Sequence, residues 1–218
     1  MLVIFDCDGV LIDSEAIFCA VDAEALTRLG HPTTAATIAE RFAGVPHRIA
    51  WSQLSTELNL QLPTSWIDDL LLECQRRFPG ELAPIRGAAT AIQTIVERGD
   101  QVCVASSTEL VSLRENLERT DLLPLLAPHV FSVDQVKRPK PAPDVFLFAA
   151  SQMGVDPADT IVVEDSVAGV MAGKRAGMRV LGFTGGGHTY GSLASCLAAA
   201  GAEHVCDDMN QVVERLSL

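Results

Sequence analysis

Lysine is scarce in this sequence of 218 residues, and no two cysteines form a CxxC pair. The only lysines are Lys137, Lys140 and Lys174. The chain has 16 basic against 28 acidic residues, which gives a formal net charge of −12. Nucleic acids and anionic membranes bind basic surfaces, because their phosphates are negatively charged. The composition therefore argues against both as partners and leaves small anions open.

Long apolar runs are also lacking, since none approaches the roughly 18 residues that a membrane span needs. The N-terminal run of residues 1–5 stops at Asp6 and has no basic region before it, so we expect no secretory signal peptide. Hydrophobic residues make up 48% of the chain, which is enough to form a core without disulfides. These features predict a soluble protein of a reducing, cytoplasmic compartment.

Short apolar runs separated by helical segments predict a parallel sheet. Each run ends in polar residues, as is typical of a strand buried on both faces. The runs are residues 2–5, 102–105, 130–133, 161–163 and 180–181. Apolar residues at helical spacing follow at 110–117, 145–153 and 167–176. Strands and helices that alternate in this way predict an α/β fold, a Rossmann-like parallel sheet covered by helices on both faces.

Residues 15–84 differ from the rest, because helical periodicity recurs there without a convincing buried strand. The stretch 79–84 contains Pro79, Gly80 and Pro84 and is typical of a hinge. We therefore predict two domains. An α/β core consists of residues 1–14 and 85–218, and an all-helical cap domain of residues 15–84 is inserted after the first strand.

Polar residues follow four of the predicted strands at the point where each ends. Ligands of open parallel sheets bind beyond the carboxyl ends of the strands. The segments at these ends are Asp6-Cys7-Asp8-Gly9, Ser106-Ser107-Thr108, the loop with Lys137, Arg138 and Lys140, and Glu164-Asp165-Ser166. Packing alone does not explain why carboxylates, hydroxyls and an ammonium converge on one rim. The pattern predicts a binding site there.

The two aspartates after the first strand are candidate catalytic residues. Gly9 lets the chain turn, so that both can reach one ligand. An ionised Asp6 is a competent nucleophile toward phosphorus, and Asp8 could protonate the leaving oxygen and then activate water. Lys140 and Ser106 could hold the oxygens of a phosphoryl group.

The carboxylates at this rim also predict a metal ion. Asp6, Asp8, Glu164 and Asp165 would repel one another without a cation. Oxygen ligands suit Mg²⁺, which keeps several waters and needs few protein ligands besides a substrate phosphate. We therefore expect Mg²⁺ as the cofactor.

These segments resemble the four motifs of the haloacid dehalogenase-like hydrolases. The stretch FDCDGVLIDSE at 5–15 is similar to the first motif and VAS at 104–106 to the second. KPAPD at 140–144 and VEDS at 163–166 are similar to the third and fourth. The motifs occur in the family's order, and the resemblance covers almost the whole chain, including the helical cap.

The resemblance implies a role for each matching position. Asp6 would form an aspartyl-phosphate, and Asp8 would act as general acid and base. Ser106, Ser107 and Lys140 would bind the phosphoryl group. The protein would then be an enzyme, a phosphatase that acts on a phosphoric monoester.

The resemblance also implies a set of ligands for Mg²⁺. Asp165 and the carboxylate of Asp6 would hold the ion together with the main-chain carbonyl of Asp8. Glu164 would help directly or through a water molecule.

Within the family, the pattern is nearest to the sugar-phosphate branch, which includes phosphogluconate phosphatase and β-phosphoglucomutase. This implies a small phosphorylated metabolite as substrate, a sugar or sugar-acid phosphate, with His47 and Arg48 as candidates for binding its other end. A phosphomutase is the alternative, although the mutase's cap histidine and arginine align here with Phe18 and His47. The phosphonatase branch is excluded, because residues 1–136 hold no lysine for its Schiff base. A phospho-accepting regulatory module is less favoured, since such modules are shorter and lack a helical insertion.

Two further segments have structural interpretations. Ser106 with Glu109 three residues later fits a helix capping box. The run of three glycines before His188 matches no phosphate-binding loop pattern, so we expect a mobile loop there.

Overall fold

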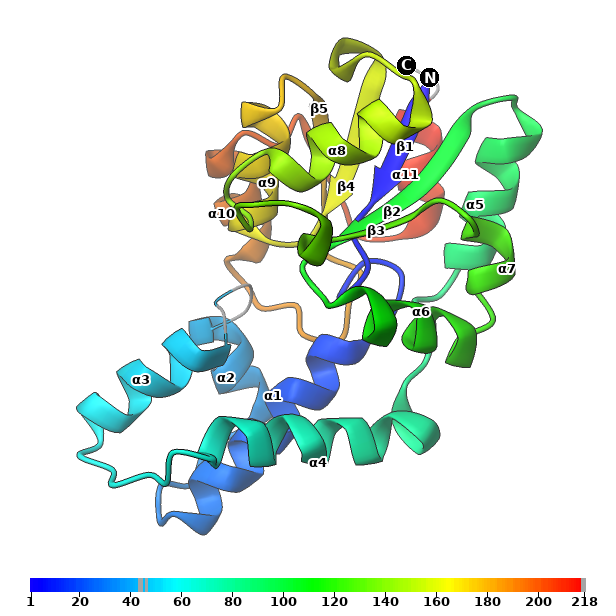
Figure 1. Ribbon diagram of the computed structural model, residues 1–218. Coiled ribbons are helices and arrows are strands. Elements are labelled where there is room, and N and C mark those ends of the chain that lie inside the picture. The colour runs from blue at the N-terminus through cyan, green and yellow to red at the C-terminus, as the bar shows by residue number, and fades with distance from the viewer. Residues whose placement is uncertain (43–44, 46, 217–218) are drawn as a thin grey trace.

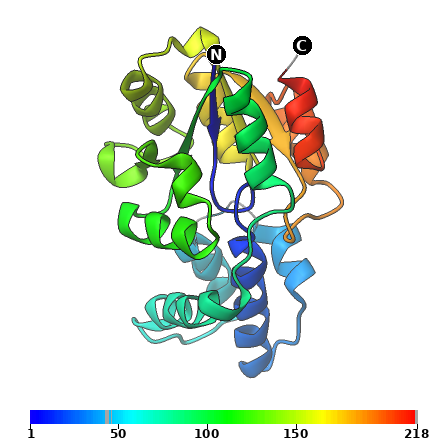
Figure 2. The same cartoon turned by 90° about the vertical axis from the view of Figure 1, so that its right-hand side faces the viewer.

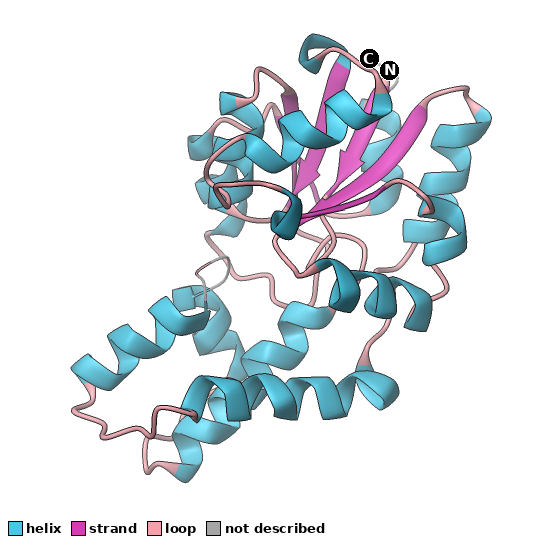
Figure 3. Cartoon of the chain, viewed as in Figure 1, coloured by secondary structure: helices cyan, strands magenta, loops and turns pink. Residues whose placement is uncertain are grey.

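The computed structural model describes residues 1–42, 45 and 47–216, and its centre is a six-stranded parallel sheet (Figure 3). The strands follow the order β3-β2-β1-β4-β5-β6. Their bounds are Leu2–Phe5 (β1), Gln101–Ser106 (β2), Val130–Ser132 (β3), Thr160–Glu164 (β4), Arg179–Phe183 (β5) and His204–Cys206 (β6). The predicted Rossmann-like α/β fold is confirmed. The short edge strand β6 was not predicted, because three residues carry too little apolar pattern.

Helices cover both faces of the sheet. Helices α5 (Ala88–Glu97), α6 (Leu110–Arg119), α7 (Leu123–Leu126) and α11 (Met209–Arg215) pack on one face. Helices α8 (Asp144–Met153), α9 (Val167–Arg175) and α10 (Leu193–Ala200) pack on the other. Figure 2 shows α5 in green and α11 in red side by side. Strands β1, β2 and β4 each contain a continuous apolar run, because their alternate side chains enter the two different cores.

Strand β1 shows this division directly. Val3 and Phe5 belong to the core under α5 and α11, and Leu2 and Ile4 belong to the core under α8 and α9. All four are fully buried. β1 pairs with β2 on one side and β4 on the other, and Phe5 lies level with residues 104 and 163. The strand that carries the first motif is therefore held in the middle of the sheet.

Four helices lie beyond the carboxyl ends of the strands (Figure 1). They are α1 (Ser14–Arg28), α2 (Ala35–Phe42), α3 (His47–Glu57) and α4 (Trp66–Glu81). They pack around an apolar cluster of their own, which includes Leu26, Trp51 and Leu70. Helical periodicity was predicted for this part of the chain, although α2 was not recognised. The domain limits at 14/15 and 84/85 stay a prediction.

The two connections between the sheet and these helices run side by side. The main-chain N–H of Asp13 donates to the carbonyl of Ala83 at 3.0 Å, and the N–H of Ile85 donates to the carbonyl of Leu11 at 2.8 Å. The predicted hinge begins later than expected, because α4 continues through Pro79 to Glu81. Among the described residues, no helix combines the length and the apolar character that crossing a membrane requires.

Candidate active site

The carboxyl ends of β1, β2 and β4 open into a cavity of about 700 Å³ between the sheet and helices α1–α4. Most of the predicted site residues line it, and they are Asp6, Asp8, His47, Ser106, Ser107, Lys140, Glu164 and Asp165. Arg48 is not among the lining residues. Its guanidinium instead pairs with Asp68 at 2.9 Å, where both side chains are about two-thirds exposed. Eight of the nine predicted residues are thus brought together.

Lys140 joins two carboxylates at the floor of the cavity. Its Nζ lies 2.5 Å from Oδ1 of Asp6 and 2.7 Å from Oε1 of Glu164. All three side chains are at least nine-tenths buried. Burial alone would lower the pKa of Lys140, but the two carboxylates raise this pKa above its usual value. The ammonium is therefore a fixed positive charge beside Asp6.

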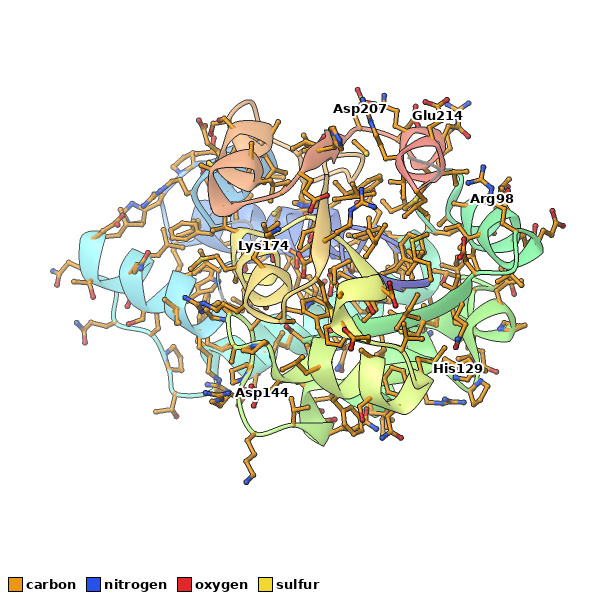
Figure 4. All side chains as sticks on the ribbon, turned by 90° about the horizontal axis from the view of Figure 1, so that it is seen from above. Arg98, His129, Asp144, Lys174, Asp207 and Glu214 are labelled. Atoms are coloured by element: carbon orange, nitrogen blue, oxygen red, sulfur yellow. The ribbon has the colours of Figure 1, made fainter. Side chains whose placement is uncertain are left out.

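Among the residues that the structure describes, Lys140 is the only lysine in the cavity wall, and Asp144 of the same motif is not part of that wall. Lys174 lies at the surface and pairs with Glu203 at 3.7 Å. Figure 4 shows Lys174 and Asp144, the last residue of the third motif, on the outside of the core. Asp144 accepts a bond from Arg138 at 2.7 Å. Lys140 and Pro141 of the third motif therefore line the cavity, and Asp144 does not.

Three buried carboxylates form a group that could hold a metal ion. One oxygen from each of Asp6, Glu164 and Asp165 lies within 4.8 Å of the others. Burial is the main cause that raises the pKa of Asp6 well above its usual value, and Lys140 offsets it only in part. Burial also raises the pKa of Asp165. The neighbouring carboxylates, Glu164 among them, also raise both pKa values, and oxygen ligands suit a hard divalent cation. The residues therefore fit such an ion.

The carboxylate of Asp8 faces hydroxyl groups rather than this carboxylate group. Ser14 Oγ donates to it at 2.6 Å, Thr108 Oγ1 at 2.7 Å and Ser106 Oγ at 3.2 Å. The two aspartates thus have different surroundings, which two different roles require. Ser14 and Thr108 were not predicted as partners of Asp8, although both lie in or beside the motif segments.

Ser106 does not cap a helix, so the expected capping box is wrong. Its Oγ accepts a bond from the N–H of Thr108 at 3.0 Å, and α6 begins only at Leu110. The residue at the N-cap of α6 is Glu109, which makes no side-chain cap bond. Ser106 is instead the last residue of β2, and its hydroxyl contacts Asp8.

Glu164 is locked in place by the start of α9. Its Oε2 accepts bonds of 2.9 Å from both the N–H and the Oγ of Ser166. Ser166 also caps the helix, because its Oγ accepts from the N–H of Gly169 at 3.0 Å. A Cβ atom at Gly169 would overlap the carboxylate of Glu164. The glycine therefore leaves the space that this carboxylate occupies.

His188 is a site residue that the sequence did not reveal. Its side chain is 2% exposed, and its Nε2 lies 3.0 Å from Oδ2 of Asp165. Burial by itself would lower the pKa of His188, but the hydrogen bond with Asp165 and that residue's charge raise it. The N–H of Gly187 also donates to Asp13 at 2.9 Å. The loop expected to be mobile thus contacts the carboxylate group, and a single histidine after glycines gave no signal of this.

Another polar group lies in the wall formed by the helices. Asp22 is 5% exposed, and its Oδ1 lies 2.8 Å from Nε2 of His47 and 2.9 Å from Nε1 of Trp51. The Nδ1 atom of His47 is buried and has no hydrogen-bond partner among the described residues. Asp22 and Trp51 were not predicted, because 25 and 29 residues separate Asp22 from its two partners in the sequence.

Comparisons with known proteins agree with this arrangement. The sequence model of the haloacid dehalogenase-like hydrolases matches residues 3–183. The chain is 30% identical to 6-phosphogluconate phosphatase of Escherichia coli K12, over 85% of this chain and 83% of the relative. It is 32% identical to a phosphorylated carbohydrates phosphatase of Thermotoga maritima, over 81% of each chain.

Solved structures give a similar result. A haloacid dehalogenase-like protein of Agrobacterium tumefaciens superposes with a TM-score of 0.93 at 38% identity, over 99% of this chain and 97% of the other. A hydrolase of Deinococcus radiodurans, with bound phosphate and sodium, has a TM-score of 0.86 at 30% identity, over 99% and 94%. A β-phosphoglucomutase-like protein of Thermotoga maritima has a TM-score of 0.78 at 28% identity, over 99% of each chain.

Proposed function

The chain belongs to the family of haloacid dehalogenase-like hydrolases, and from this we propose that it is a Mg²⁺-dependent phosphatase of a small phosphorylated metabolite. The substrate is a sugar or sugar-acid phosphate. The relatives support this, because two of them are named for phosphogluconate and for phosphorylated carbohydrates. The observation that carries the proposal is the buried Asp6–Lys140 pair in a cavity that also presents the carboxylate of Asp8.

In the first step, an oxygen of the Asp6 carboxylate attacks phosphorus while the bond from phosphorus to the alcohol oxygen breaks. The carboxyl of Asp8 gives its proton to the departing oxygen. Ser106, Ser107 and Lys140 hold the oxygens of the phosphoryl group, since the ammonium offsets the charge of the transition state. The products are an aspartyl-phosphate on Asp6 and a free alcohol.

In the second step, the carboxylate of Asp8 takes a proton from a water molecule, and the water oxygen attacks phosphorus. The bond between phosphorus and Asp6 breaks, which releases phosphate and restores both aspartates. The hydroxyls of Ser14 and Thr108 hold the Asp8 carboxylate in its place for both proton transfers.

Asp6, Asp165 and the main-chain carbonyl of Asp8 would hold Mg²⁺, with Glu164 beside it. When bound, the ion supplies positive charge that neutralises the phosphoryl oxygens. Three buried carboxylates with one ammonium support this assignment. His188 orients Asp165 through its contact at 3.0 Å, as partners of metal ligands commonly do.

Helices α1–α4 act as a cap over the cavity, with residues 15–84 as the domain. Closing of the cap excludes water from the first step, and its opening lets the product leave. The paired connections at residues 11–13 and 83–85 give the two parts a short, narrow joint. A phospho-accepting regulatory module would have no use for such a cap.

The test is phosphate release from para-nitrophenyl phosphate. Asp6→Asn should lower the rate at least about a thousandfold, because the amide is a poor nucleophile. Asp144→Asn is the matched control, since Asp144 belongs to a motif segment but lies outside the cavity, and its rate should stay within about twofold. EDTA should stop the wild type and Mg²⁺ should restore it.

If Asp6→Asn turned over substrate at a rate near that of the wild type, the assignment of Asp6 as the nucleophile would be wrong. The phosphomutase alternative, which a β-phosphoglucomutase-like neighbour keeps open, predicts an isomerised sugar phosphate in place of free phosphate and free sugar. Analysis of the products by NMR separates the two reactions.

A further inference from the structure

The wall of the cavity that faces the carboxylates is mainly apolar. Helices α1–α4 and Val45 form it, with side chains that include Phe18, Ile38, Phe42, Ile49 and Leu71. Under the proposed function, the phosphoryl group lies at the sheet and the rest of the substrate touches this wall. An apolar wall fits the carbon-bound hydrogens of an alcohol.

The described part of this wall also contains no lysine or arginine side chain. Among the described residues, Lys140 is the only lysine or arginine that lines the cavity, and it is already bound to Asp6 and Glu164. Every arginine of helices α1–α4 has a carboxylate partner outside the cavity. Arg28 and Arg77 pair with Glu24, Arg41 with Glu57, Arg48 with Asp68, and Arg76 with Glu73. The wall residues Glu15 and Asp22 are acidic.

A second anion on the substrate would therefore lie unpaired in this part of the cavity. Removing a carboxylate from water without a cationic partner is costly. A hydroxyl in the same place avoids this cost. Charge by itself thus separates uncharged alcohols from acids here.

His47 provides a specific partner for such a hydroxyl. Asp22 holds the ring by accepting from its Nε2, and Trp51 holds Asp22 by donating to the same oxygen. With Nε2 bonded to Asp22, Nδ1 is the ring atom left without a partner. A hydroxyl can both donate and accept, so it can form a hydrogen bond with Nδ1.

We propose, on the basis of the phosphatase function above, that this protein selects phosphomonoesters of uncharged sugars or polyols and rejects esters that carry a second anionic group. The carbon chain packs against the apolar wall, and one hydroxyl bonds to Nδ1 of His47. Sugar-acid phosphates and bisphosphates are excluded by the lack of a cation. This separates the protein from its relative named for 6-phosphogluconate.

A matched pair of substrates tests the charge selection. Sorbitol 6-phosphate and 6-phosphogluconate differ in one terminal group, a hydroxymethyl in the first and a carboxylate in the second. The kcat/KM of the wild type should be at least about tenfold higher for sorbitol 6-phosphate. Equal values, or a preference for 6-phosphogluconate, would overturn the inference.

The two proposals fail in different ways. If para-nitrophenyl phosphate is hydrolysed in an Asp6-dependent reaction but the matched pair is not distinguished, the phosphatase stands and the selection is wrong. If none of the three esters releases phosphate, the proposed function is wrong and the selection falls with it.

Ile49 offers a way to change the selection by charge. Its side chain lines the cavity and is 50% exposed, so a longer polar side chain fits without repacking a core. Ile49→Lys should raise kcat/KM for 6-phosphogluconate relative to sorbitol 6-phosphate by about fivefold or more, because it supplies the missing cation. Ile49→Gln, of similar length but neutral, should leave this ratio within about twofold. The same ratio in both variants would contradict the charge argument.

His47→Ala tests the hydroxyl contact. Its KM for sorbitol 6-phosphate should rise by about tenfold, since a hydrogen bond to the substrate is lost. The KM for para-nitrophenyl phosphate, which has no such hydroxyl, should rise much less. A structural defect would raise both KM values alike, and that result would remove His47 from the binding site.

Discussion

Gly169→Ala is a change of one methyl group that should disable the carboxylate group of the active site. A Cβ atom at this position would overlap the carboxylate of Glu164. Gly169 and the end of β4 are both buried, so neither can move away easily. We therefore expect Glu164 to leave its place and to lose its bonds to Lys140 and Ser166.

The expected loss of stability follows from these bonds. Glu164 accepts one bond from Lys140 at 2.7 Å and two from Ser166 at 2.9 Å. Hydrogen bonds to a charged group contribute about 1.5–3 kcal/mol each. The higher helix propensity of alanine offsets about 1 kcal/mol of this loss of stability. If the carboxylate keeps some contact with water or Ser166, a net destabilisation of roughly 2–4 kcal/mol remains.

Gly80→Ala is the matched control for this variant. Gly80 also lies in a helix, but a Cβ atom there would meet nothing within 4 Å. The same substitution should therefore leave stability unchanged or raise it by up to about 1 kcal/mol. Comparing the two variants cancels the intrinsic preference of alanine for helices.

The assay is urea unfolding monitored by circular dichroism, with and without Mg²⁺. Gly169→Ala should unfold at clearly lower urea than Gly80→Ala, and its melting temperature should fall by roughly 5–15 °C. Its phosphatase rate should fall at least about tenfold, because Lys140 loses one of its two partners. Equal stability of the two alanine variants, within about 0.5 kcal/mol, would refute the steric reasoning.

Two further predictions concern single contacts. His188→Leu should weaken Mg²⁺ binding about tenfold, because Asp165 loses the donor that orients it. Isothermal titration calorimetry measures the Kd for Mg²⁺. An unchanged Kd would show that this contact does not contribute to ion binding. Arg48→Ala should keep kcat/KM within about twofold and stability within about 0.5 kcal/mol, because its ion pair is exposed and lies outside the cavity. A large loss of kcat/KM for sorbitol 6-phosphate would instead show that Arg48 takes part in substrate binding.

The core of the fold could be predicted because its strands are buried on both faces. Such strands contain continuous apolar runs, so the runs in β1, β2 and β4 stand out from the polar residues that follow them. β6 lies at the edge of the sheet, and its first residue, His204, is exposed. α2 has eight residues, and its apolar positions Ile38, Ala39 and Phe42 make too short a pattern to separate it from a loop.

The candidate site divides in the same way. Asp6, Asp8 and Asp165 directly follow strands, and the common direction of parallel strands brings them to one edge. Their grouping therefore follows from local patterns and one topological rule. His188 and Asp22 contact the site from separate loops and helices, so nothing beside them in the sequence marks their partners. Arg48 shows the reverse error, because a basic residue beside the site can turn its side chain to the surface.

The sequence by itself determined the class of chemistry. Carboxylates, a lysine and hydroxyls after successive buried strands, in an order shared with one family of hydrolases, required only local pattern and strand direction. The tertiary structure decided what surrounds that chemistry: which acid pairs with Lys140, which hydroxyls hold Asp8, and which wall of the cavity has no cation. These facts depend on distances between segments far apart in the chain, and packing sets such distances. The net charge of −12 therefore gained its meaning only in the folded protein, where part of it lines a cavity with one lysine.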